Sequence, residues 1–238
     1  MNKKELLYEG KAKRVYLTDE PGIVIHDYKD SATAFDGKKR GEIKGKGFVN
    51  ARMTALIFDY LEGRGIKTHM VKVLSLTELA THHLQMLKVE LIVRNVAAGS
   101  LAKRTGYSEG QALRKPLVEY YLKDDALGDP MLAPAHIEEL ELLTPEQLRR
   151  VTEIGLAVND AMIPFFAEIG LKLIDFKLEF GLQDGEVILA DEFSPDTSRL
   201  WDMETDEKMD KDRFRRDLGN VEETYAEVMR RVEERWGG

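Results

Sequence analysis

The 238-residue chain is 43% hydrophobic and 33% charged, a composition typical of a soluble, fully folded protein and not of a disordered chain or a coiled coil. Its formal net charge of -8 argues against nonspecific nucleic-acid binding, which needs a basic face to neutralise phosphates. The absence of cysteine excludes disulfides and thiol chemistry, and with no signal-like N-terminus or run of ~20 apolar residues we expect a cytoplasmic protein without membrane partners.

The first part of the chain is predicted to be rich in strands. Strands are expected over residues 7–17, 22–28, 70–76 and 89–96, and a helix over residues 48–61. Residues 18–22 have a turn composition, and the Gly- and Lys-rich segment 36–47 is either a mobile solvated loop or a flexible clamp for an anionic substrate. Residues 84–87 are the expected crossing point between two lobes. These are an N-terminal, strand-rich lobe of residues 1–84 and a larger lobe of residues 85–238.

Helix signals are stronger in the second part of the chain. Residues 144–147 have the form of a capping box with proline at the first helical position. Apolar residues at helical spacing continue to Phe165, and Pro164 is expected to bend or end that helix. A β-hairpin over residues 173–202 follows, and an apolar stripe over residues 214–236 predicts one C-terminal helix. Early strands and a late hairpin framed by helices indicate an α+β fold with antiparallel sheets.

The predicted hairpin carries charges of both signs on one face. Asp175, Lys177 and Glu179 are two residues apart, so they project from the same side of a strand, and the apolar residues between them take the other side. Glu179 and Asp191 could lie close together across the pairing. Two such carboxylates repel unless a lysine or a hard cation neutralises them, and Mg²⁺ accepts one or two carboxylates together with phosphate oxygens. A solvated strand face with cross-strand ion pairs is the alternative.

Two other segments could hold anionic groups. After Gly10, Lys11 and Lys13 are predicted to share a strand face, where they and backbone N–H groups could cover phosphates, although one glycine is a weak signal and this segment alone favours an exposed strand. Arg94 and Ser100 end an apolar strand in a Gly-Ser turn, which is either a plain turn or a phosphate site. The five histidines form no metal-binding pattern and are read as structural or surface residues.

The loop after the hairpin is unusually rich in polar groups. Ser194, Asp196, Ser198 and Arg199 place hydroxyls, a carboxylate and a guanidinium on a short segment that contains proline. Arginine favours bidentate binding of a phosphate or a carboxylate. The segment is therefore a candidate anion site, with a solvated loop as the alternative.

Taken together, these segments resemble the phosphoribosylaminoimidazole-succinocarboxamide synthases, or SAICAR synthetases. The matching stretches are Leu7–Lys13, Val93–Ser100, Leu173–Gly181, Leu189–Asp202 and Lys208–Arg215. They occur in the family's order over nearly the whole chain, and two are long and unusual enough to be diagnostic. The resemblance implies a two-lobed fold related to those of protein kinases and ATP-grasp enzymes, usually assembled as a homodimer.

The resemblance also implies a reaction. A SAICAR synthetase joins L-aspartate to the carboxylate of carboxyaminoimidazole ribonucleotide (CAIR), with ATP converted to ADP and phosphate. We expect an acyl phosphate intermediate, because a carboxylate does not react with an amine unaided. The implied partners are ATP, Mg²⁺ and the two small substrates.

The resemblance assigns roles residue by residue. The residues expected to bind ATP are Lys11, Ala12, Lys13, Val15, Met86 and Lys123. The expected ligands of Mg²⁺ are Glu179 and Asp191, which belong to a catalytic group together with Asp175 and Lys177. The residues expected around CAIR are Arg94, Ser100, Asp196 and Arg199, joined by Lys177. The candidates for the aspartate carboxylates are Asp36, Lys46, Lys211 and Arg215.

Three other functions are open at this point. A small-molecule kinase would keep the Mg²⁺ carboxylates but would need no aspartate. A noncatalytic nucleotide-binding regulator would bind ATP without turnover. A protein that only binds other proteins is the third, but it would not need charged residues that converge on one end of a hairpin.

Overall fold

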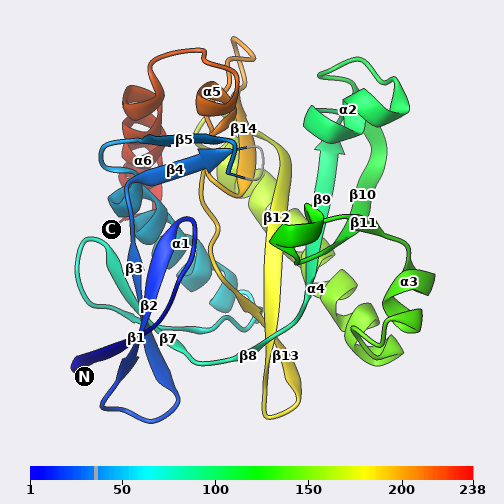
Figure 1. The fold of residues 1–238 in the computed structure, drawn as a ribbon. Coiled ribbons are helices and arrows are strands. Elements are labelled where there is room, and N and C mark those ends of the chain that lie inside the picture. Colours follow the sequence, from blue (N-terminus) through cyan, green and yellow to red (C-terminus); the bar gives the residue numbers. More distant parts are fainter. Residues whose placement is uncertain (35–36, 238) are drawn as a thin grey trace.

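The computed structural model describes residues 1–34 and 37–237. Its N-terminal part is a five-stranded sheet with neighbouring strands antiparallel, in the order β1-β2-β3-β7-β6 (Figure 1). The strands are β1 (Lys3–Glu9), β2 (Lys13–Thr18), β3 (Ile23–Tyr28), β6 (Met70–Val73) and β7 (Glu78–His82). The expected single strand 7–17 is therefore wrong. The chain reverses at residues 10–12, so Lys11 lies in a turn and Lys13 begins the next strand.

The second sheet has seven strands and supports most of the charged residues discussed below. Its central path is β11-β10-β9-β12-β13, and β8 and β14 also pair with β12. The strands are β8 (Gln85–Met86), β9 (Val89–Val96), β10 (Ala112–Leu122), β11 (Met131–Leu132), β12 (Leu171–Gln183), β13 (Glu186–Ala190) and β14 (Ser198–Asp202). Antiparallel pairing throughout confirms the expected α+β class.

The helices flank these sheets (Figure 1). They are α1 (Lys46–Glu62), α2 (Gly99–Thr105), α3 (Pro134–Glu139), α4 (Pro145–Ala167), α5 (Asp212–Arg215) and α6 (Val221–Trp236), with a 3-10 turn η1 (Asp125–Leu127). The predicted capping box is present, because Thr144 and Gln147 each accept a hydrogen bond from the other's backbone N–H. The helix does not end at Pro164 but continues for three residues, with Phe165 and Phe166 fully buried in the core.

Two sequence expectations are corrected by local backbone conformation. The apolar stripe over residues 214–236 is not one helix, because Asp217, Gly219 and Asn220 adopt positive φ angles between α5 and α6. The Gly- and Lys-rich segment is not a plain loop. Its residues 39–42 form β5 (Lys39–Glu42), which pairs with β4 (Ser31–Ala34), and α1 begins at Lys46 after the left-handed Gly45.

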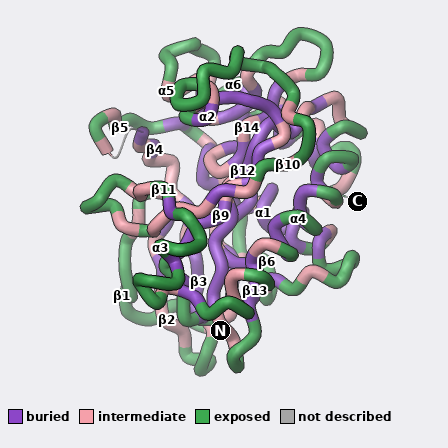
Figure 2. Tube along the Cα trace, turned by 90° about the vertical axis from the view of Figure 1, so that its right-hand side faces the viewer, coloured by how far each residue is buried: buried purple, intermediate pink, exposed green. Residues whose placement is uncertain are grey.

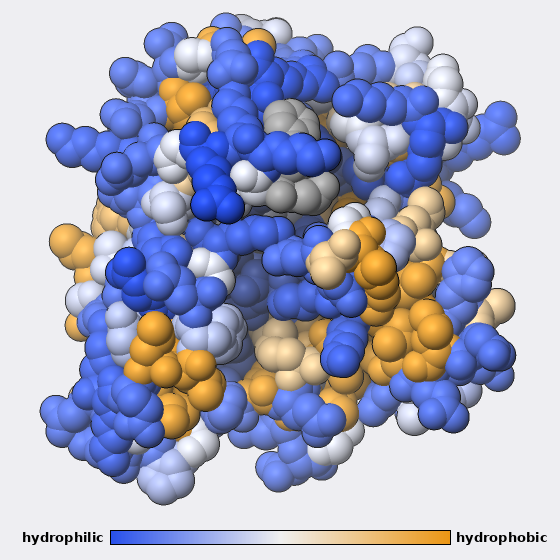
Figure 3. Space-filling model, viewed as in Figure 1, coloured by the Kyte–Doolittle hydropathy of each residue, from blue (hydrophilic) through white to orange (hydrophobic). Residues whose placement is uncertain are grey.

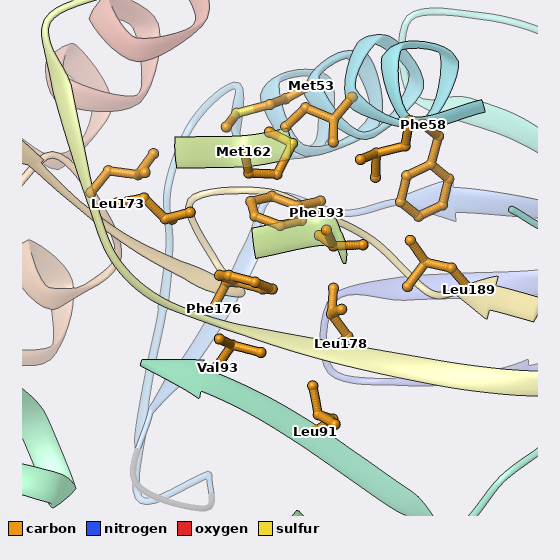
Figure 4. Close-up of a cluster of buried hydrophobic side chains, with 14 of the residues drawn as sticks. Met53, Phe58, Leu91, Val93, Met162, Leu173, Phe176, Leu178, Leu189 and Phe193 are labelled. Atoms are coloured by element: carbon orange, nitrogen blue, oxygen red, sulfur yellow. The ribbon is translucent and has the colours of Figure 1, made fainter. Parts of the chain in front are cut away.

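The main core lies between the second sheet and helices α1 and α4. Leu91 and Val93 of β9, Phe176 and Leu178 of β12, and Met162 of α4 point into it (Figure 4). Figure 2 shows buried residues along β9 and β12 with exposed segments around them. The predicted apolar face of the hairpin is therefore buried, which leaves the alternating charged positions on the opposite side. No helix among the described residues is long and apolar enough to cross a membrane.

Candidate active site

A cavity of about 640 Å³ opens between the β1–β2 turn and the charged face of β9 and β12. Figure 3 shows a hollow near the middle of the side of the molecule that faces the viewer, with mostly hydrophilic residues around it. Most of the predicted site residues line the cavity: Lys11, Ala12, Lys13, Arg94, Ser100, Lys123, Asp175, Lys177, Glu179, Asp191, Asp196, Arg199, Lys211 and Arg215. The alternative of a solvated strand face is wrong in one part, because Asp175 and Glu179 are buried, but the cross-strand ion pairs that it expected are present between Arg94 and Asp175 and between Glu90 and Lys177.

Three of the other predicted site residues, all of them described by the structure, do not line the cavity. Val15 is buried on β2, and Met86 is half-exposed on β8, where the chain passes from the first sheet into the second. Lys46 is fully buried at the start of α1. Asp36 lies outside the described residues.

Strand register explains why these charges converge. Asp175 of β12 is paired with Arg94 of β9, and Lys177 with Ile92. Period-two alternation then places positions 90, 92 and 94 of β9 beside positions 175, 177 and 179 of β12 on the cavity side. Glu179 lies opposite Ala190 of β13, next to Asp191.

Lys177 and Glu179 form the centre of a buried charge cluster. The Lys177 Nζ lies 2.6 Å from Glu179 Oε1 and 2.8 Å from Glu90 Oε1, and Lys123 donates to the other oxygen of Glu179. Burial acts to lower the pKa of Lys177, but Glu179 and Glu90 outweigh it and raise the pKa. Burial raises the pKa of Glu90 to about 7. The cluster thus holds a charged ammonium beside two carboxyl groups.

Lys13 holds the acidic end of β13 from the opposite wall. Its Nζ lies 2.7 Å from Asp191 Oδ1, 3.4 Å from Glu192 Oε1 and 4.7 Å from the centre of the Tyr28 ring. Burial opposes both charges, yet the pKa of Lys13 is well above its usual value because of Asp191, and that of Asp191 is lowered because of Lys13. Both groups therefore remain ionised in the cavity.

Burial and the Asp191 charge both act to raise the pKa of Glu179, but Lys177 and Lys123 outweigh them and lower it. The two predicted metal carboxylates thus influence each other, and both line the cavity. Neighbouring lysines keep both of them ionised.

Arg94 and Arg199 share one carboxylate. Arg94 donates from Nη1 to Asp175 at 2.8 Å and from Nε to Glu119 at 2.8 Å, and its Nη2 lies 3.1 Å from Ser100 Oγ. Arg199 donates from Nη1 to both oxygens of Asp175. Two guanidinium groups are therefore fixed side by side at one end of the cavity, although Arg94 itself is only 2% exposed.

Asp196 accepts hydrogen bonds from two lysines and a tyrosine. Its Oδ2 accepts from Lys211 Nζ at 2.8 Å and from Lys46 Nζ at 3.3 Å, and its Oδ1 accepts from the Tyr225 hydroxyl at 2.6 Å. Burial opposes the charge on Asp196, but Lys211 and Lys46 lower its pKa. This arrangement brings together Lys46 and Lys211, which were both predicted for the aspartate substrate.

Four residues of the site were missed from the sequence: Glu90, Glu119, Glu192 and Tyr225. Glu90 had a usable signal, because it is four residues before Arg94 in a strand and must share its face. Glu192 directly follows Asp191 in the sequence, and both contact Lys13. Glu119 and Tyr225 contact residues 25 and 29 positions away, and nothing in the local pattern announces those contacts.

Comparisons with known proteins identify the family of the chain. The family model described as SAICAR synthetase matches residues 6–232. A phosphoribosylaminoimidazole-succinocarboxamide synthase from Lysinibacillus sphaericus is 52% identical over 98% of this chain and 99% of its own length.

Two solved structures are similar over nearly the whole chain. The enzyme of that name from Ehrlichia chaffeensis has a TM-score of 0.94 at 40% identity, covering 96% of this chain and 98% of that one. A SAICAR synthetase solved in complex with ADP has a TM-score of 0.92 at 44% identity, covering 96% and 97%. The chain therefore belongs to the SAICAR synthetase family of ATP-dependent ligases of purine biosynthesis.

Proposed function

We propose that this chain joins L-aspartate to the carboxylate of CAIR through an acyl phosphate, with the residues of the cavity in the roles given below. One observation carries the proposal: a single cavity is lined by ionised carboxylates held by lysines, a pair of arginines on one carboxylate, and a further lysine, Lys211, on Asp196. These groups match a reaction that brings together a nucleotide, a phosphorylated substrate and a dicarboxylate.

The nucleotide is assigned to the wall formed by the β1–β2 turn. Lys11, Ala12, Lys13 and Lys123 line the cavity there, and a related structure was solved with ADP. Val15 and Met86 are assigned to the adenine end. The two-lobe division at residues 84 and 85 is part of this proposal, with the nucleotide between the lobes.

Glu179 and Asp191 are proposed to hold Mg²⁺. Two carboxylates that face one cavity suit this ion, which takes one or two carboxylates and completes its coordination with phosphate oxygens and water. Within residues 1–34 and 37–237 no group of three or more acidic or histidine side chains is arranged for a metal, so the nucleotide phosphates would supply the other ligands. When bound, the ion would neutralise negative charge on those phosphates.

The ribonucleotide phosphate is assigned to Arg94, Ser100 and Arg199. Arg199 is the more accessible guanidinium, whereas Arg94 is buried and would act beside Ser100 at the cavity end. Asp175 contacts both arginines, and Lys177, which lines the cavity, is assigned to the substrate carboxylate. The second substrate, aspartate, is assigned to Lys211 and Arg215, which line the cavity, with Asp36 as a further candidate. Lys46 is fully buried and supports this site through Asp196. Asp196, which was expected around CAIR, is instead assigned to holding Lys211 in place.

The proposed chemistry has two steps. The CAIR carboxylate oxygen attacks the γ-phosphorus of ATP, the bond from that phosphorus to the bridging oxygen breaks, and ADP leaves. The aspartate amine then attacks the acyl carbon, and the bond from carbon to the phosphate oxygen breaks. The ammonium group loses two protons, of which one leaves with phosphate and the other passes to solvent. Lys13, Lys123 and Lys177 would stabilise the charge that builds on the transferring phosphoryl group.

A coupled assay of ADP formation tests this function. ADP release should require ATP, CAIR and aspartate together, and omission of any one should abolish product formation. Equal ADP release without aspartate would identify a kinase and exclude the ligase. The homodimer and the cytoplasmic location are further proposals that rest on the family, and sedimentation equilibrium measures the first of them.

A further inference from the structure

The hydroxyl of Tyr225 reaches the active site from a distant element. Tyr225 lies on α6, which packs against α1, and its side chain is only 1% exposed. Its hydroxyl donates to Asp196 Oδ1 at 2.6 Å, across 29 residues of sequence. The short distance is that of a strong hydrogen bond from a hydroxyl to a carboxylate.

The two oxygens of Asp196 have separate partners. Oδ1 accepts from Tyr225, whereas Oδ2 accepts from both Lys211 and Lys46. The final torsion of an aspartate side chain is soft, so a hydrogen bond to one oxygen is what fixes the direction of the other. The position of Oδ2 in turn determines where the two ammonium groups lie.

The phenol is also suited to act as a permanent donor. Burial raises the pKa of Tyr225 well above its usual value, and the neighbouring Asp196 charge raises it further. The hydroxyl therefore stays protonated at neutral pH and keeps donating to the carboxylate.

We propose that Tyr225 is a positioning residue for the aspartate substrate, because its hydroxyl orients the Asp196 carboxylate that holds Lys46 and Lys211. The inference rests on the proposed function, in which Lys211 binds the aspartate substrate while the buried Lys46 helps to hold Asp196. Tyr225 does not line the cavity, so it acts through Asp196 and not on the substrate itself.

The test compares two Tyr→Phe variants. Tyr225→Phe removes only the hydroxyl and keeps the buried ring. Tyr120→Phe is the matched control, because the Tyr120 hydroxyl also makes one hydrogen bond, to Thr152 Oγ1 at 2.8 Å, but on the α4 side of the sheet. The expected result for Tyr225→Phe is a rise of about tenfold in the KM for aspartate, the scale of one lost hydrogen bond on a charged group. The kcat and the KM values for ATP and CAIR should stay unchanged, and Tyr120→Phe should leave all four constants unchanged.

Replacing Tyr225 with 3-fluorotyrosine keeps the hydroxyl and should preserve the wild-type KM for aspartate. An unchanged KM in Tyr225→Phe would overturn the proposal. An equal rise in the KM of all three substrates, or a loss of activity that follows a lowered melting temperature, would overturn it as well, because either result indicates a general structural role. Failure of the proposed function is distinct from these outcomes, since the wild-type protein would then release ADP without aspartate.

Discussion

The carboxylate of Asp175 is paired with the guanidinium of Arg199 through both of its oxygens, at 3.0 and 2.9 Å from Nη1. One of these oxygens also accepts from Arg94, and Asp175 is only 3% exposed. A single buried carboxylate thus keeps two like-charged groups close together. Without it, the two guanidinium groups would repel each other in a region of low dielectric.

Asp175→Asn should therefore lower both stability and affinity for the ribonucleotide. The substitution keeps the side-chain shape but leaves the buried Arg94 and the partly buried Arg199 without their shared counter-charge, which should cost about 3 kcal/mol. Urea unfolding measures the loss, and steady-state kinetics should give a raised KM for CAIR. Asp206→Asn is the control, because Asp206 pairs with Lys172 on the surface, where an ion pair contributes about 0.5 kcal/mol. Equal stability losses in the two variants would contradict the argument.

Gly99→Ala should displace the guanidinium of Arg199. A Cβ built at Gly99 would lie 2.5 Å from Arg199 Nη2 and 2.8 Å from its Cζ, and Gly99 has a φ of +53°. The variant should raise the KM for CAIR and lose about 1–2 kcal/mol of stability from the left-handed backbone alone. Substrate titration and urea unfolding measure the two effects separately.

Gly106→Ala separates backbone strain from the clash. Gly106 has a φ of +75°, but no atom lies within 4 Å of a Cβ built there. This variant should lose a similar amount of stability and keep the wild-type KM for CAIR. If both variants raised that KM equally, the role of Arg199 in binding the ribonucleotide would be wrong.

Asp191→Asn should cut kcat more than it changes the KM for aspartate. Loss of the carboxylate removes a proposed ligand of Mg²⁺ and the partner of Lys13, and losing one such electrostatic group typically costs about 10²–10³ in kcat. Mg²⁺ titration of the activity should shift to higher concentrations. Asp184→Asn is the control, because Asp184 lies in the turn at the other end of the same hairpin. Both aspartates have positive φ angles, 66° and 52°, which asparagine adopts readily. An unchanged kcat in Asp191→Asn would exclude the metal role.

The charged floor of the site was predictable because it depends on strand periodicity alone. Asp175, Lys177 and Glu179 alternate with residues that are fully buried, and one register places Asp175 beside Arg94. The predicted strand 89–96 coincides with β9. The local pattern is sufficient to predict which side chains share a face where one face of a strand is buried. A shift of the strand pairing by one residue would expose all of its apolar side chains.

The pairing of the other site residues depends on contacts between residues far apart in sequence. Lys46 and Asp196 are 150 residues apart, and Lys13 and Asp191 are 178 apart. The sequence therefore suggested that these residues belong to the site without showing which of them form pairs. The wrong predictions of one strand over residues 7–17 and of one helix over residues 214–236 have a different cause. Neither boundary shows in the apolar pattern: β1 ends at Glu9 before the turn at residues 10–12, and the positive φ angles of Asp217, Gly219 and Asn220 separate α5 from α6.

Acidification should destabilise the protein through its buried histidines. Burial lowers the pKa of His69 to about 3, with Lys13 acting in the same direction, whereas an unfolded chain would protonate it near its usual value of 6.5. Between these values the unfolded state binds the proton and the folded state does not, so stability falls as pH falls from 6.5 towards 3. His69 alone should account for a loss of about 2 kcal/mol between pH 7.5 and pH 5.

The free energy of unfolding in urea, measured across this range, should therefore depend less on pH in His69→Gln than in the wild type. His83→Gln is the control, because His83 is exposed on the surface. Parallel pH profiles for the wild type and His69→Gln would show that His69 is not kept neutral by burial, since removal of a group that titrates only in the unfolded state must flatten the curve.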